Sequence, residues 1–214
     1  DLRNTYILFA IVLLIIILTI VFVKYFGNQL NIFNKYNQPI IQLSFDENTG
    51  TKVSDKTGYL EDGYINYVFN DAKFQDNSDP QHTSTAIKGN ALIFDGYSTY
   101  IEYKNVMFEP TSFSCSVWIA PRAFEWGDKG LPSTIISQYN SSKREGFQFG
   151  VYRHGSYGLE IYTDNGKIKI ESKQIEDYIN TFEWTQLAFT YDNETGTVDL
   201  YRNGELKMSE SISK

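Results

Sequence analysis

A strictly alternating segment is the feature that most limits the fold of this chain. Phe113 to Ile119 reads FSCSVWI, with an apolar residue at every second position. Because successive side chains of a strand point to opposite faces, this pattern predicts a strand with one face in a hydrophobic core. Pro121 has no N–H group for a strand ladder, so we expect the strand to end there and a loop to begin.

Short segments of the same kind recur from residue 39 to the end of the chain. Turn signals separate them about every 8 to 12 residues, which is typical of an antiparallel sandwich. Asn165-Gly166 and Asn203-Gly204 each lie between two such segments and predict hairpins, whereas Gln75 to Thr85 reads as a polar surface loop. We expect strands at Pro39–Phe45, Tyr64–Phe69, Ala91–Phe94, Tyr97–Tyr103, Phe113–Ile119, Thr134–Gln138, Gly146–Tyr152, Gly158–Tyr162, Lys167–Ile170, Trp184–Tyr191 and Thr197–Tyr201.

Composition supports a β-rich domain and narrows its partners. Aromatic residues make up 16% of the chain, with 16 Tyr, and there are 15 Gly for turns. The formal net charge of −7 argues against nucleic acid, heparin-like polyanions or anionic lipid as partners of the globular part. Cys115 is the single cysteine and lies on the inward face of the alternating strand, so we interpret it as a buried thiol.

The N-terminal region has a different character from the rest of the chain. Tyr6 to Val23 holds 18 residues without a charge, and at a rise of about 1.5 Å per residue it matches a bilayer core of about 30 Å. The residues after it lack a signal-peptidase pattern, so residues 1–27 are expected to be an uncleaved membrane anchor. Residues 28–38 are polar and Asn-rich, which indicates a tether. We expect residues 39–214 to form one domain on the extracellular face.

Three segments together resemble a known family. They are ALIFDGYSTYIEY (Ala91 to Tyr103), SFSCSVWIAP (Ser112 to Pro121) and EWTQLAFTYDNETGTVDLYRNGEL (Glu183 to Leu206). Their order and spacing resemble the laminin-G-like, concanavalin-A-like jelly roll over nearly all of residues 39–214. The resemblance implies an all-β antiparallel jelly-roll sandwich. It also implies that Trp118 and Trp184, which occupy strand positions of the family, pack in the core.

A narrower resemblance involves two further segments. APRAFEWGDKG and GFQFGVYRHGSYGLEIYTDNG (Gly146 to Gly166) are similar to the accessory module ahead of the catalytic domain in some bacterial family 32 glycoside hydrolases, which act on fructans and sucrose-like substrates. Jelly rolls of this type usually close with further strands after the Asn-Gly hairpin. We therefore expect the domain to be truncated at its C-terminus.

These two segments also carry the chemistry of a sugar site. Aromatic rings can stack on the apolar face of a sugar, while charged side chains bond its hydroxyls. We predict that a ligand contacts the loop Arg122 to Gly130 together with the region Tyr152 to Tyr157. The alternative is that the Trp of this loop folds inward and that the charged residues pair with one another. The candidate carbohydrate-binding residues are Trp126, Glu125, Asp128, Tyr152, Arg153, His154 and Tyr157.

A structural calcium ion is a further possibility that the family allows. Asp46, Asp55 and Asp95 are candidate ligands, although Asp residues also serve in turns and caps. No other cofactor is indicated. Catalytic residues are not recognisable either, because neither His82 nor His154 has a nucleophile and an orienting carboxylate at a recognisable spacing, and the Trp-Met-Asn-Asp-Pro-Asn-Gly-like signature of family 32 is absent.

The sequence therefore predicts a membrane-tethered, extracellular carbohydrate-binding or accessory jelly-roll module that is not catalytic within these residues. One alternative is the N-terminal part of a surface-anchored family 32-like glycoside hydrolase whose catalytic domain lies beyond residue 214. A second alternative is a structural or adhesion domain without a glycan ligand.

Overall fold

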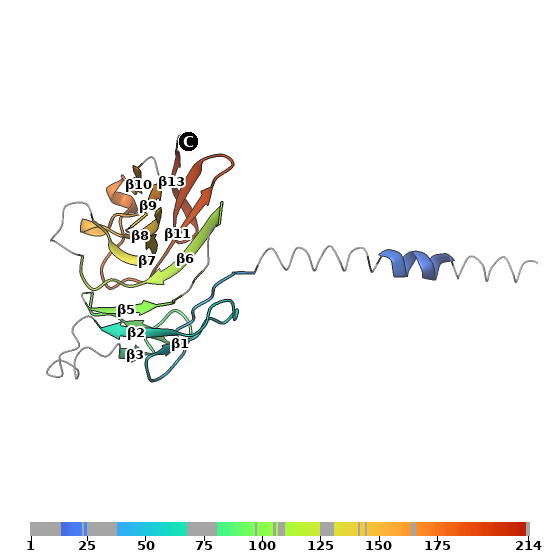
Figure 1. Cartoon of the computed structure of the whole chain (residues 1–214), viewed down its shortest axis with the longest axis horizontal. Coiled ribbons are helices and arrows are strands. Elements are labelled where there is room, and N and C mark those ends of the chain that lie inside the picture. Colours follow the sequence, from blue (N-terminus) through green and yellow to red (C-terminus); the bar gives the residue numbers. More distant parts are fainter. Residues whose placement is uncertain are drawn as a thin grey trace, which may run out of the picture.

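The computed structural model of the chain is built almost entirely from antiparallel strands (Figure 1). It describes residues 14–22, 24, 38–67, 81–96, 98–104, 106, 110–124, 131–140, 142–143, 145–163 and 166–212. The all-β prediction is confirmed, since the elements after residue 38 are strands and two short 3₁₀ helices, η1 (Arg153–Gly155) and η2 (Ile175–Asp177).

Two four-stranded sheets face each other and form a sandwich. One has the order β13-β12-β11-β6, and the other has the order β10-β9-β8-β7. The strands of the first sheet are β6 (Phe113–Ile119), β11 (Thr185–Asp192), β12 (Thr197–Arg202) and β13 (Glu205–Ser211). Those of the second are β7 (Ser133–Asn140), β8 (Glu145–Val151), β9 (Tyr157–Thr163) and β10 (Gly166–Glu171).

The core lies between these two sheets and follows the period-2 pattern of the strands. Phe149 of β8 and Phe189 of β11 are fully buried, and their ring centroids are 4.9 Å apart. Burial of one such side chain contributes about 1.5–3 kcal/mol. The strand predicted at Phe113–Ile119 forms with those bounds. Cys115 packs against the core, as expected from its inward position, and burial raises the pKa of its thiol to about 11.

Both predicted Asn-Gly hairpins form. In the second, Arg202 pairs with Glu205, and Asn203 and Gly204 both have positive φ, 52° and 81°. Positive φ at both central residues is the type I′ turn, whose twist matches that of the flanking strands. In the first hairpin Thr163 pairs with Gly166, while Asn165 lies outside the described residues.

The N-terminal part of the domain adds two small sheets. The first has the order β1-β2-β5, from β1 (Lys52–Val53), β2 (Gly63–Tyr67) and β5 (Thr99–Glu102), and the second pairs β3 (Gln81–Thr83) with β4 (Ala91–Ile93). Figure 1 shows β5, β2 and β1 below β6 and β7 of the sandwich. Residues 81–83, which were expected in a loop, are thus a strand, because they find a partner in β4.

The strand expected at Pro39–Phe45 is wrong. This segment makes one bridge, Leu43 to Asp55, and its other backbone contact runs from Lys56 N to Gln42 O at 2.8 Å. Phe45 has φ 56°, in the left-handed region, so an extended strand cannot continue through it.

The core position expected for Trp118 is also wrong. Its neighbours Val117 and Ile119 point into the core, so alternation along β6 turns Trp118 outward, where it is 46% exposed. Trp184, which directly precedes β11, is half-buried.

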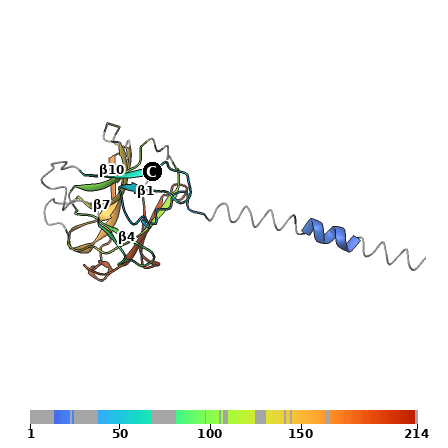
Figure 2. The same cartoon turned by 90° about the horizontal axis from the view of Figure 1, so that it is seen from below.

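The N-terminal residues that the structure describes are helical, at positions 14–22 and 24. Figures 1 and 2 show residues 14–22 clear of the strands. These helical residues make up no helix with the length and apolar character needed to span a bilayer. Residues 6–13 and 23 of the expected anchor lie outside the described residues.

Candidate functional site

Glu160 is a fully buried carboxylate on the side of β9 that faces away from the core. Its neighbours Leu159 and Ile161 point inward and belong to the core, so alternation places Glu160 on the outer side of the sheet. Oε1 lies 3.1 Å from Lys167 Nζ, and Oε2 accepts a hydrogen bond of 2.6 Å from Tyr162 Oη. A buried charge is tolerated because it is paired and hydrogen-bonded in this way.

Tyr152 completes this cluster from the end of β8. It is buried, and its hydroxyl donates a hydrogen bond of 3.2 Å to Glu160 Oε1. The ammonium of Lys169 lies 3.8 Å from the centre of its ring. Burial, together with the nearby Glu160 carboxylate, raises the pKa of the Tyr152 hydroxyl well above its ordinary value. The Tyr152 ring, which was predicted to stack on a sugar, is therefore enclosed. Tyr152 contributes to the outer surface only indirectly, by holding Glu160 in place.

The exposed aromatic group of this surface is a pair of tyrosine rings. Tyr139 of β7 and Tyr162 of β9 are both in register with Gly146 of β8, which has no side chain between them. The two ring centroids lie 4.3 Å apart at 42°. Tyr139 is 43% exposed, so one ring is presented to solvent while its partner is held by Glu160. We call this outer side of sheet β7–β10 the tyrosine face, defined by Tyr139, Gln148, Tyr152, Glu160, Tyr162 and Lys167.

Charges on the tyrosine face balance. Lys167 pairs with Glu160, and Lys169 Nζ lies 2.6 Å from Glu171 Oε2 on the same side of β10. Gln148 adds a neutral amide that donates to Thr134. The surface thus offers an aromatic ring beside polar groups without a net charge.

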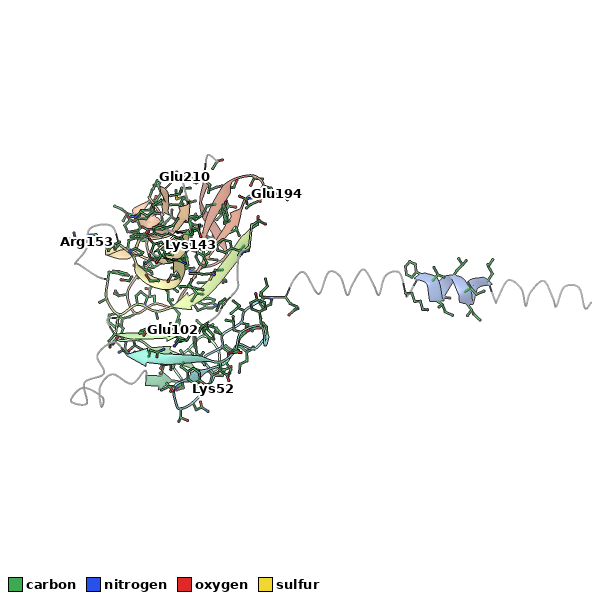
Figure 3. The ribbon with its side chains drawn as sticks, in the orientation of Figure 1. Lys52, Glu102, Lys143, Arg153, Glu194 and Glu210 are labelled. Atoms are coloured by element: carbon green, nitrogen blue, oxygen red, sulfur yellow. The ribbon has the colours of Figure 1, made fainter. Side chains whose placement is uncertain are left out.

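The turn after β8 brings two of the predicted segments together. Arg153 and His154 are exposed in η1, where His154 has φ 68° and Gly155 has φ 95°. A Cβ on Gly155 would lie only 3.0 Å from Phe124 Cζ, so Phe124 packs against the turn. Figure 3 shows Arg153 at the margin of the domain opposite the helix of residues 14–22. The described start of the loop Arg122 to Gly130 therefore meets this turn, whereas Glu125, Trp126 and Asp128 lie outside the described residues.

Tyr157, the remaining predicted site residue, lies on the other side of the sheet. It is fully buried between the sheets, and burial, with Asp177 nearby, raises the pKa of its hydroxyl to about 12. Its ring belongs to the core and not to the tyrosine face.

The three aspartates considered for calcium accept hydrogen bonds within the protein. Asp46 accepts from Asn90 N at 3.2 Å, and Asp95 accepts from Ser98 N and Thr99 N, both at 2.9 Å. Asp55 accepts five hydrogen bonds from its own turn and from Gln42. Within the described part of the chain, no group of three His, Cys, Asp or Glu side chains is close enough to hold a metal ion.

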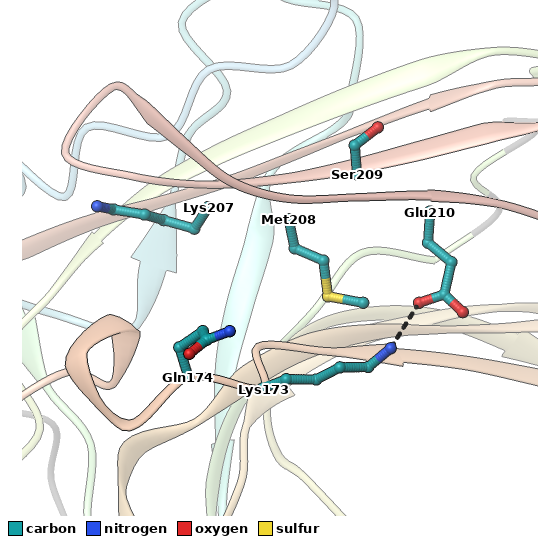
Figure 4. A pocket seen from close by; sticks show the side chains of 6 residues that line it. All are labelled: Lys173, Gln174, Lys207, Met208, Ser209 and Glu210. Atoms are coloured by element: carbon teal, nitrogen blue, oxygen red, sulfur yellow. Dashed lines mark hydrogen bonds and ion pairs between the residues drawn. The ribbon is translucent and has the colours of Figure 1, made fainter.

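A hollow of about 320 Å³ lies between β13 and residues 173–174, which follow β10 (Figure 4). Lys173 pairs with Glu210 at 3.3 Å across it, and Lys207 pairs with Asp177 and Glu205. Its charges are therefore satisfied within the protein. Three of these charged residues, Glu205, Lys207 and Glu210, lie on the edge strand β13, where charged side chains oppose pairing with another chain.

Sequence reasoning missed Tyr139, Glu160, Tyr162 and Lys167. A signal was present, because Tyr157, Leu159 and Ile161 alternate with Gly158, Glu160 and Tyr162. The pattern defines two faces of one strand, yet it does not tell which residue of the neighbouring strands meets them. That information is in the register.

The fold is a β-sandwich with a polar aromatic surface on one sheet, and comparison with known proteins assigns it to a family. Residues 95–214 match the model of the concanavalin A-like lectin/glucanases superfamily, so the chain belongs to this superfamily. The laminin-G-like, concanavalin-A-like fold predicted from the sequence is thereby confirmed. No curated protein sequence matches the chain significantly.

At least one solved structure shares this fold over most of the chain. Domain 4 of AbnA, a GH43 extracellular arabinanase from Geobacillus stearothermophilus, in complex with arabinotriose, aligns with a TM-score of 0.55 and 21% identity over 81% of this chain and 77% of that one. The CBM40 of the Ruminococcus gnavus IT-sialidase, bound to α2,3 sialyllactose, aligns with a TM-score of 0.30 and 19% identity over 36% of this chain and 40% of that one. The first alignment shows a shared fold.

Proposed function

We propose that this domain is a carbohydrate-binding module that holds a glycan on its tyrosine face. The observation that carries the proposal is the ring pair of Tyr139 and Tyr162, fixed from below by the buried Glu160. An exposed tyrosine ring held in one orientation presents a flat apolar surface to the C–H groups of a sugar ring, and little conformational entropy is lost on binding.

Polar groups around the ring pair suit the hydroxyls of such a ligand. Lys167 keeps ammonium protons beyond the one that contacts Glu160, and its side chain is 40% exposed. Gln148 lies between the two strands that carry the rings. Because the face has no net charge, a neutral glycan fits it better than a strongly acidic one.

The same geometry favours binding over hydrolysis. Glycosidases need two carboxyl groups that flank the scissile bond, one of them free to donate a proton. Glu160 is fully buried under two tyrosines and Lys167, and Glu171 is bound by Lys169 and by Ser156 Oγ at 2.5 Å. We therefore propose a non-catalytic role for the tyrosine face.

Calorimetric titration tests this function. The full chain in detergent micelles would be titrated with fructo-, arabino-, xylo- and cello-oligosaccharides. In the Tyr139→Ala variant, binding at the tyrosine face should be at least about tenfold weaker. Tyr64→Ala is the control, because it removes a ring that is 54% exposed on β2, in a different sheet. Equal binding by wild type and Tyr139→Ala would contradict the proposal.

We propose further that residues 6–23 tether the domain to the outer face of a membrane. The run has no charge. Within its described part, all the large apolar side chains are about half exposed, and the hydroxyl of Thr19 donates a hydrogen bond to the carbonyl of Ile15. A helix that is apolar all round and satisfies its own polar groups is suited to lipid. Protease treatment of intact cells should release the domain while the apolar segment stays in the membrane fraction. Recovery of the untreated chain in the soluble fraction would contradict this tether.

A further inference from the structure

A second aromatic surface lies on the outer side of the other sheet of the sandwich. Along β6, the residues at positions 113, 115, 117 and 119 pack against the core, so Ser114, Ser116 and Trp118 face outward. Trp118 is 46% exposed. An indole is largely apolar, and the strand presents it at the surface of the sheet.

The register of the sheet surrounds Trp118 with small and polar side chains. Trp118 is opposite Gln186, and Ser116 is opposite Ala188, which in turn pairs with Tyr201. The small residues Ser116 and Ala188 leave the sheet surface flat between Trp118 on the edge strand β6 and Tyr201 on β12. We call this surface the tryptophan face, defined by Ser114, Ser116, Trp118, Gln186, Ala188, Thr190, Asp199, Tyr201, Leu206 and Ser209.

Hydrogen bonds hold the polar groups of the tryptophan face in place. Gln186 Nε2 donates to Ser116 Oγ at 2.9 Å, beside the indole. Tyr201 Oη donates to Asp199 Oδ2 at 3.3 Å. The surface therefore combines one exposed ring with oriented amide, hydroxyl and carboxylate groups, which is the chemistry that recognises a sugar.

Charge narrows the class of ligand. At the outward positions of β6, β11, β12 and β13 that the structure describes, the charged residues are Asp192 and Asp199, and no Lys or Arg is present. A surface with acidic groups alone repels acidic glycans, nucleic acid and anionic lipid. A neutral, hydroxyl-rich chain has no such penalty.

We propose that the tryptophan face is a second binding site, which takes a neutral oligosaccharide across its four strands with Trp118 as the stacking ring. Strands about 4.8 Å apart make this surface about 14 Å wide, enough for several sugar units. The proposal shares the ligand class of the tyrosine face but depends on different residues. Because the two surfaces lie on opposite sides of the sandwich, one domain can bridge two glycan chains, and avidity for a polysaccharide exceeds that for a short oligosaccharide.

The test is a calorimetric titration of the full chain in detergent micelles with neutral fructo-, arabino-, xylo- and cello-oligosaccharides. Wild type should bind about two ligands per chain, Trp118→Ala and Tyr139→Ala about one each, and the double variant none. Phe182→Ala is the matched control, because it removes a ring that is 75% exposed and lies on neither face. Trp118→Tyr keeps a stacking ring and should retain the second site, which separates loss of binding from loss of folding.

The outcomes distinguish the two sites. Loss of all binding in Trp118→Ala alone, with Tyr139→Ala unchanged, would uphold the tryptophan face and overturn the tyrosine face. Binding at one site that Tyr139→Ala abolishes and Trp118→Ala leaves unchanged would overturn the inference drawn here. It would also be overturned if no neutral oligosaccharide bound, or if Trp118→Ala altered only self-association in sedimentation, which would make the face a protein interface.

Discussion

Asp55 offers the sharpest test of how the N-terminal part of the domain is held together. It is 9% exposed. Oδ1 accepts from Gln42 N at 2.7 Å and from Thr57 N at 3.1 Å. Oδ2 accepts from Thr57 Oγ1 at 2.6 Å, Tyr59 N at 3.0 Å and Leu60 N at 3.1 Å. One carboxylate therefore fixes its own turn and ties it to the segment around Gln42. The change Asp55→Asn keeps the shape but replaces one acceptor oxygen with a donor.

The contribution of Asp55 to the free energy of unfolding follows from the pKa of its carboxyl group. Burial by itself raises this pKa, but the hydrogen bonds from Gln42, Thr57 and Leu60 outweigh it and lower the pKa from 3.8 to about 2. Each tenfold change in acid dissociation is worth about 1.4 kcal/mol, so the ionised carboxylate contributes about 2.5 kcal/mol to the free energy of unfolding. Because the folded-state pKa is the lower one, this stabilisation is complete above about pH 4 and is lost as the pH falls toward 2.

Denaturant unfolding followed by circular dichroism from pH 7 to pH 2 measures this contribution. Asp55→Asn should lower the free energy of unfolding by about 2.5 kcal/mol at pH 7, and the difference from wild type should shrink below about pH 4. Glu61→Gln is the control, because Glu61 is exposed in the same loop and its change should stay within about 0.5 kcal/mol. A difference that persisted unchanged to pH 2 would refute the reasoning.

Three further predictions concern the sandwich itself. Gly158→Ala should be far more destabilising in urea titration than Gly204→Ala, because a Cβ at Gly158 would lie 2.1 Å from Ile170 O. A Cβ at Gly204 would meet open space, so only the φ of 81° at that position opposes a side chain, at a cost of about 1 kcal/mol. Equal effects of the two variants would contradict this prediction. Cys115 should react with a thiol reagent at pH 8 only after denaturant is added, since burial raises its thiol pKa to about 11, and fast labelling of the folded chain would be the contrary result. Glu160→Gln should lower the free energy of unfolding by about 1–3 kcal/mol through the loss of charge-assisted hydrogen bonds, and an unchanged urea midpoint would count against the buried cluster.

The local sequence patterns of strands and turns predicted the sandwich well. Period-2 alternation placed Phe113–Ile119 with its observed bounds. The Asn-Gly turn placed the hairpin at Asn203-Gly204, because only a few residue types accept positive φ at two successive positions. These features depend on residues close in sequence, and sequence carries that information directly.

Features that depend on distant partners were harder to predict. The segment Pro39–Phe45 is apolar enough for a strand, but it bonds to the turn of Asp55 and is interrupted at Phe45. Residues 81–83 are polar, yet β4 supplies a ladder for them. Trp118 was assigned to the core from a family position, although the alternation of its own strand already pointed it outward.

In the candidate site, too, the features that depend on distant partners could not be predicted from the sequence. Tyr152 was predicted to contact a glycan, but in the structure it is buried, and its contacts are with Glu160 of β9 and Lys169 of β10. Tyr139 lies far from Tyr162 in sequence, and Gly146 brings their rings together across a third strand. Such a pair becomes visible only once the strand order and register are known.

Mapping of a bound glycan by amide chemical shifts tests the central claim most directly. The isotope-labelled chain would be titrated with the neutral oligosaccharide that binds best. Our account predicts the largest shifts at Tyr139, Gln148, Tyr162 and Lys167, with a second set around Trp118. Shifts confined to other surfaces, with the tyrosine face unchanged at saturation, would contradict it.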